Sequence, residues 1–150
     1  FFLTPDCPAA LDFDNIDALT HAAMDLRRAL QCAGITGAKG AEIDHIEFLG
    51  APQTPQGHGR NFVLCPGGAY DRSPCGTGCS AKLACLAEEG LLEPGTPWVQ
   101  ESIIDSTYIL RYHRDAQGQV IPLIEGEAHV TAQATLLFEE TDPYRAGIRA

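Results

Sequence analysis

The sequence has few basic residues and no long apolar run. Ten Lys and Arg residues stand against twenty Asp and Glu residues, which gives a formal net charge of −10 at pH 7. This charge repels phosphate backbones and anionic membrane surfaces, so we expect neither nucleic acid nor a membrane as a partner. No stretch approaches the roughly 18 apolar residues of a membrane span, and the first residues lack the cationic flank of a signal peptide.

Lysine and paired cysteines are also scarce. Only Lys39 and Lys82 are present, and neither adjoins an apparent phosphate cup, which argues against a pyridoxal phosphate enzyme. The six cysteines form no Cys-x-x-Cys pair, which disfavours a thiol redox protein, and they lack the paired spacing of zinc knuckles, so no metal site is expected. Most of them lie in apolar runs, which favours reduced, buried thiols and a cytoplasmic protein.

The composition predicts one globular domain over residues 1–150, because 45% of the residues are hydrophobic and 20% are charged. Helical periodicity predicts two helices, over residues 14–33 and 79–89. Strands are predicted at the first residues and over 42–49, 61–65, 98–104, 108–113, 120–124 and 129–139. The helix at 79–89 is almost wholly small or apolar. The fold class is therefore α+β, with an antiparallel sheet wrapped around a central hydrophobic helix.

The last predicted strand has a clear two-residue period. Its apolar residues alternate with polar ones and are Val130, Ala132, Ala134, Leu136 and Phe138. This pattern is typical of a strand with one face in contact with solvent.

The segment 71–78, with the sequence DRSPCGTG, places a cysteine at the start of the predicted central helix. Unpaired backbone N–H groups and the positive end of the helix dipole meet there, which favours anions and lowers the pKa of a thiol. The amides of Gly76 and Thr77 can receive a substrate carboxylate while Cys75 faces the α-carbon. Asp71 can accept hydrogen bonds from the substrate ammonium. This arrangement is suited to proton transfer at the α-carbon of an amino acid, which is one of several interpretations that the residues alone leave open.

Other interpretations of this segment remain open. A cysteine at a helix start can simply be a small buried residue. The glycines of 76–81 loosely fit a dinucleotide-binding loop, although Pro74 and nine residues separate them from the preceding strand.

His45 and His58 are candidate ligands or acid–base groups, and the common alternative is a hydrogen-bonded structural histidine.

Several motifs together resemble the proline racemase family, which includes 4-hydroxyproline 2-epimerases. They are DRSPCGTG at 71–78, SAKLA at 80–84, WVQESII at 98–104, DHIEF at 44–48, RNFVLCPGG at 60–68 and the ending at 141–148. The resemblance implies a diaminopimelate-epimerase-like fold of two similar halves, with no cofactor. In that family one cysteine from each half flanks the substrate, so that one thiolate removes the α-proton and the opposite thiol returns one.

Carried onto this sequence, the resemblance makes Cys75 the second of the two catalytic cysteines. Gly76 and Thr77 then hold the substrate carboxylate, Asp71 contacts the substrate nitrogen, and His45 lines the pocket. The substrate is expected to be a proline-like amino acid. The family's first cysteine motif, Met-Cys-Gly-His-Gly, has no counterpart here, and the chain begins without a Met. We therefore expect the C-terminal part of a two-domain enzyme, inactive without its N-terminal half.

Two further functions stay open at this point. The resemblance also covers 3-hydroxyproline dehydratases, in which threonine often replaces the cysteine at this position. A non-catalytic module that binds an amino acid is the alternative from another class. A homodimer is the default expectation for the assembly, and Cys79, four residues after Cys75, is a candidate for a regulatory disulfide or a packing residue.

Overall fold

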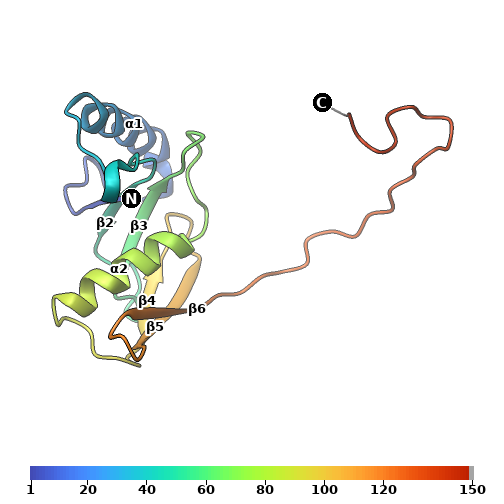
Figure 1. Cartoon of the computed structure of the whole chain (residues 1–150). Helices are drawn as coiled ribbons and strands as arrows, with labels where there is room; N and C mark the ends of the chain where they lie inside the picture. Colours follow the sequence, from blue (N-terminus) through green and yellow to red (C-terminus); the bar gives the residue numbers. More distant parts are fainter. Residues whose placement is uncertain (149–150) are drawn as a thin grey trace.

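The computed structural model describes residues 1–148, which form a six-stranded sheet and two α-helices (Figure 1). The strands follow one another across the sheet in the order of the sequence. Their bounds are β1 Phe2–Thr4, β2 Ile46–Gly50, β3 Gly59–Leu64, β4 Trp98–Glu101, β5 Thr107–Arg114 and β6 Val120–Glu125. The helices are α1, Ile16–Cys32, and α2, Gly76–Glu88, and short 3-10 turns occupy Phe13–Asn15 and Ala38–Gly40.

The sheet is mixed, which corrects the prediction of an antiparallel sheet while the α+β class is confirmed. β1 pairs with β2 and β3 with β4 in parallel, whereas the other neighbours are antiparallel. A parallel pair of strands needs a long crossover between them. α1 lies within the connection from β1 to β2 and α2 within that from β3 to β4, so each helix accompanies one parallel pair.

Helix α1 packs against an apolar face of β2 and β3. Its three buried residues are Leu19, Ala23 and Leu30. They share one core cluster with Ile46, Phe48, Phe62 and Leu64. The predicted amphipathic helix is therefore confirmed, and its buried stripe follows the steps of three and four residues seen in the sequence.

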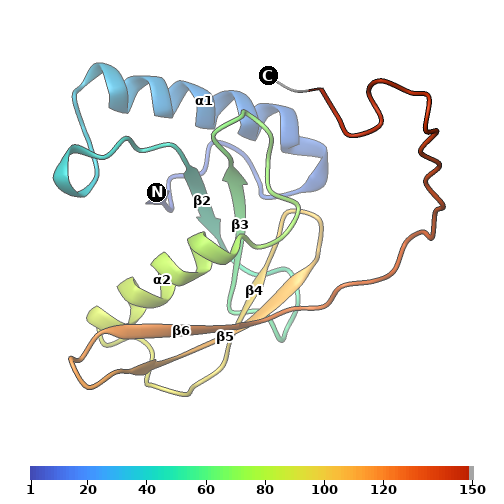
Figure 2. The same cartoon turned by 45° about the vertical axis from the view of Figure 1, so that its right-hand side comes forward.

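Helix α2 packs mainly against β5 and β6, as both views show (Figure 2). Its residues Cys79, Leu83 and Ala87 share a second core cluster with Leu110 and Tyr112. The helix begins at Gly76, three residues before the predicted start. This earlier start makes Cys75 the residue that caps the helix.

The strand predicted over 129–139 is not formed in the structure. The chain leaves the sheet after β6 and runs away from it without regular structure (Figure 1). Along this segment Val130 is 95% exposed and Leu137 is 87% exposed. Alternation alone does not make a strand, because backbone N–H and C=O groups also need a partner strand, and the described residues provide none for this segment.

The remaining expectations concern cysteines and membranes. All six cysteines lie within residues 1–148 and are free thiols, but only Cys75 and Cys79 are buried, whereas Cys32 and Cys85 are exposed. The prediction of mostly buried thiols is therefore wrong. Among the described residues no helix has the length and apolar character needed to cross a membrane.

Candidate active site

Cys75 sits directly before the first turn of α2 in an uncommon backbone conformation. Its φ angle is +63°, in the left-handed region that side-chain-bearing residues rarely adopt. The residue is only 6% exposed, and its Sγ accepts a hydrogen bond from the Gly78 N–H at 3.4 Å. The thiol is therefore held against the amide end of the helix.

The amides of Gly76 and Thr77 belong to this first turn, where a helix offers no internal acceptor. Thr77 is exposed and Gly76 is partly exposed. A side-chain carbon at Gly76 would meet no atom within 4 Å, so the space beside it is open. The two predicted carboxylate-binding amides and Cys75 therefore lie together at one accessible helix end.

Asp71 lies at the other end of the loop that leads into Cys75. Its Oδ1 accepts hydrogen bonds from the N–H and the hydroxyl of Ser73, both at 2.9 Å. The Ser73 Oγ in turn accepts from the Cys75 N–H at 3.1 Å. Asp71 thus stabilises this loop through hydrogen bonds, which the sequence did not indicate. Its contact with substrate stays a prediction.

The pKa of the Cys75 thiol is raised to about 11, mainly by burial. The Gly78 N–H lowers it, but the charges of Asp71 and Glu47 raise it further. The sequence predicted the opposite direction from the helix dipole alone. Burial outweighs the helix end here, so the thiol is protonated near neutral pH.

His45 approaches the site only through the ring of Phe1. The two rings stack with their centroids 4.3 Å apart, and the Phe1 ring lies beside Gly78, with its Cε1 3.2 Å from where a side-chain carbon would stand. The Nδ1 of His45 is paired with Asp44 Oδ1 at 2.7 Å, and this hydrogen bond lowers the pKa of Asp44. A role of His45 in lining the pocket stays a prediction.

A polar layer beneath the first turns of α2 escaped the sequence analysis. It comprises Glu47, Asn61, Lys82 and Gln100, all at most 9% exposed. Asn61 donates to Glu47 Oε1 at 2.8 Å, and Lys82 Nζ donates to Gln100 Oε1 at 3.0 Å. Asn61 is the first residue of the strand predicted over 61–65 and is polar, whereas the next three residues are apolar. Alternation along the strands was the available signal, since Glu47 and Asn61 lie on the face opposite Phe48 and Phe62.

Cys79 faces into the same layer. Its thiol donates to the Pro74 carbonyl at 3.2 Å, and burial raises its pKa. These contacts fit a packing residue, and a disulfide role has no support in the geometry.

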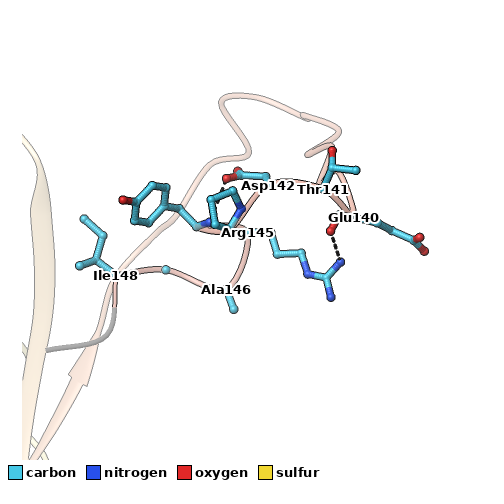
Figure 3. A pocket seen from close by; sticks show the side chains of 9 residues that line it. Glu140, Thr141, Asp142, Arg145, Ala146 and Ile148 are labelled. Atoms are coloured by element: carbon cyan, nitrogen blue, oxygen red, sulfur yellow. Dashed lines mark hydrogen bonds between the residues drawn. The ribbon is translucent and has the colours of Figure 1, made fainter.

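Among the surface hollows of the described residues, one lies near this region and another lies along the tail. One adjoins the loop before Cys75 and is lined by Asp71, Ser73, Ser106, Glu127 and His129, among others. The other is formed entirely by residues 140–148, where Arg145 donates to the Glu140 carbonyl (Figure 3). This second hollow contains none of the candidate site residues. No group of three or more His, Cys, Asp or Glu side chains suited to a metal ion occurs within residues 1–148.

Comparison with known proteins identifies the family of the chain. The family model described as proline racemase matches residues 2–149. A 4-hydroxyproline 2-epimerase of Roseibium alexandrii is 57% identical over 149 residues, which cover 99% of this chain and 46% of that protein. A 4-hydroxyproline 2-epimerase of Roseibium aggregatum is 58% identical and is covered to 48%. The chain thus spans about half the length of these relatives.

Solved structures show the same fold. A hydroxyproline epimerase from Agrobacterium vitis, with bound trans-4-hydroxy-L-proline, superposes with a TM-score of 0.68 at 27% identity, covering 95% of this chain and 43% of that one. A probable proline racemase from Agrobacterium radiobacter gives a TM-score of 0.70 at 24% identity, over 95% of this chain and 44% of that one, and supports the fold alone. The chain belongs to the proline racemase family.

Proposed function

We propose that this chain is the C-terminal part of an enzyme that inverts the α-carbon of 4-hydroxyproline. One observation carries the proposal: a buried thiol, Cys75, lies beside the backbone N–H groups of Gly76 and Thr77, which belong to the first turn of α2. The choice of substrate is supported by the relatives that bear the name 4-hydroxyproline 2-epimerase and by the hydroxyproline bound in the Agrobacterium vitis enzyme.

The substrate carboxylate would dock on the amides of Gly76 and Thr77. As the α-proton leaves, negative charge moves onto this carboxylate, and fixed N–H donors stabilise it. Asp71 would accept from the substrate ammonium through the oxygen that Ser73 does not occupy. These contacts fix which face of the α-carbon is turned toward the Cys75 sulfur.

Two thiols would then exchange protons with the two faces of the α-carbon. A thiolate outside residues 1–150 takes the α-proton and becomes a thiol, while the C–H electron pair passes to the carboxylate-stabilised carbanion. Cys75 gives its proton to the opposite face, and its S–H electron pair remains on sulfur as a thiolate. Because burial raises the pKa of Cys75 to about 11, its thiol carries the proton near neutral pH that this step requires. In the reverse direction the roles are exchanged.

A single thiol cannot carry out both transfers, so we expect no turnover by the chain alone. The partner would be the N-terminal half of the same enzyme, which would supply the second thiol and the far side of the pocket. Residues 1–150 would then form one of two domains.

The test joins this chain to the N-terminal half of the Roseibium aggregatum relative and follows the interconversion of the two 4-hydroxyproline epimers, with deuterium entry at the α-carbon, in heavy water. Cys75→Ser should lower the rate of interconversion at least about a hundredfold, the lower end of what general acid–base groups contribute. Exchange of the single epimer that the other thiolate deprotonates can continue. Cys85→Ser is the matched control, because this exposed cysteine lies near the far end of the same helix. Its exchange rate should be unchanged.

Three outcomes would contradict the proposal. Interconversion of the two epimers at an undiminished rate in Cys75→Ser would show that the thiol is not an acid–base group. Loss of water from 3-hydroxyproline without exchange of 4-hydroxyproline would favour a dehydratase. Binding of 4-hydroxyproline without any exchange would favour an amino-acid-binding module.

A further inference from the structure

The backbone of Cys75 needs contacts that hold it in place. Within residues 1–148 the other side-chain-bearing residues with a positive φ are Lys39 and Asp105, which are exposed. Cys75, by contrast, is buried and directly precedes a helix. A positive φ costs free energy for a residue with a side chain, and such strain persists only where the surroundings fix it.

The peptide group between Pro74 and Cys75 is held from both sides. On one side the Cys75 N–H donates to Ser73 Oγ. On the other side the Pro74 carbonyl accepts from Asn61 Nδ2 at 2.8 Å and from the Cys79 thiol at 3.2 Å. Because a peptide group is planar, these contacts fix its orientation and therefore constrain the rotation about φ of Cys75.

Asn61 reaches this peptide group from the centre of the sheet. It lies in β3, opposite Leu49 of β2, and is 1% exposed. Asparagine is a poor strand residue, and a buried amide is costly unless it is hydrogen-bonded. Nδ2 has two donor hydrogens, and its two acceptors are the Pro74 carbonyl and Glu47 Oε1, each at 2.8 Å. Both donor hydrogens of the Asn61 amide are therefore used, and the two acceptors fix its orientation.

Glu47 fixes the direction of the Asn61 amide and also lies against the helix end. It is fully buried in β2. Its Oε2 lies against Gly78, so close that any side chain at position 78 would collide with it. A glycine at this point of α2 therefore lets the buried carboxyl group approach the first turn.

We propose that Asn61, oriented by Glu47, is a positioning residue that holds the Pro74–Cys75 peptide and so keeps the Cys75 thiol at the amide end of α2. Its consequence for catalysis rests on the function proposed above. The positioning role itself does not depend on that function, because it concerns how solvent and reagents reach the Cys75 thiol. It can be measured without substrate.

The test is the rate at which iodoacetamide alkylates Cys75, followed by peptide mass spectrometry across a pH series that includes 9.0, the ordinary pKa of the thiol. Asn61→Leu keeps the number of heavy side-chain atoms but has no donor. Losing a hydrogen bond should release the buried thiol to solvent and speed alkylation about tenfold. Exposed Cys85, on the same helix, is the internal reference and should keep its rate.

Phe62→Leu is the matched control, because Phe62 is the next residue of β3 and is equally buried on the opposite face. It should destabilise the protein yet leave the Cys75 rate within about twofold, since it removes no bond to Pro74. If Asn61→Leu fails to fold, as judged by circular dichroism, Asn61→Ala tests the same loss of the donor without adding a branched side chain.

An unchanged Cys75 rate in the Asn61 variants would overturn the proposal. Equal acceleration in Phe62→Leu would overturn it as well, because general loosening would then explain the effect. Selective acceleration in the Asn61 variants supports positioning even if the two epimers still interconvert at an undiminished rate in Cys75→Ser. That result for Cys75→Ser would contradict only the proposed function and would leave the positioning role intact.

Discussion

The two helices cover the sheet in chemically different ways. α1 buries Leu19, Ala23 and Leu30 against an apolar face of β2 and β3. α2 shares an apolar cluster with β5 and β6, but its first turns lie over the polar layer that includes Glu47 and Asn61. The same two central strands therefore present an apolar face to one helix and a hydrogen-bonding face to the start of the other.

This difference separates stability from site geometry. Apolar burial is non-directional, so the α1 face contributes free energy without dictating the position of any one atom. Buried hydrogen bonds contribute little net free energy but fix directions. The α2 face uses such bonds next to Cys75, the one residue whose backbone and thiol must both be placed.

The largest expected effect on the free energy of unfolding comes from truncating an apolar side chain that α1 buries against the sheet. Leu19→Ala removes a side chain with no exposure and should lower the free energy of unfolding by about 3 kcal/mol through lost burial and a cavity. Urea titration measures this loss. Leu26→Ala, at a partly buried position of the same helix, should lose less. Under conditions where the folded state still predominates, a marked change of the Cys75 alkylation rate in Leu19→Ala would break the separation between the two faces.

A smaller effect is expected from the thiol itself. The folded-state pKa of Cys75, about 11, exceeds the ordinary value of 9.0. The folded protein therefore holds this proton more tightly than the unfolded chain does. The stability that results is fully present below pH 9 and is lost as the pH rises toward 11.

Cys75→Ser should remove this alkaline loss. Comparing the free energy of unfolding of the two proteins from pH 8 upward should show the original chain losing about 2 kcal/mol more by pH 11. Cys32→Ser, at an exposed thiol, serves as the control and should behave like the original chain. Parallel curves for all three proteins would mean that burial does not perturb Cys75.

A feature could be predicted from the sequence when the residues that form it lie close together along the chain. Both helices and the strands up to β6 followed from periodicity. Cys75, Gly76, Thr77 and Asp71 gather at one helix end because they are neighbours in the chain. Their local order sufficed to find them, although not to foresee that burial would dominate the pKa of the thiol.

Features that depend on strand register could not be predicted in this way. Asn61 meets Glu47 because β2 and β3 pair with Leu49 opposite Asn61, and it meets Pro74 only once α2 has crossed over the sheet. The two parallel pairings likewise follow from crossovers, which periodicity does not reveal. Pattern analysis therefore missed the polar layer, although it located the cysteine that this layer supports.

The segment 126–139 completes the comparison, because its apolar side chains contact neither helix cluster. Leu136 is 75% exposed and belongs to the alternating pattern that predicted a strand. In the chain alone, Leu136→Asp should change the free energy of unfolding by less than about 0.5 kcal/mol, as at other exposed sites. In the protein joined to an N-terminal half, a partner strand would bury this side chain, and the same substitution would then cost at least about 2 kcal/mol. Urea titration of both forms measures this difference, and Gln133→Asp, at an exposed polar position of the same segment, is the control. The result distinguishes a segment that needs a partner strand from one that stays exposed in the joined protein.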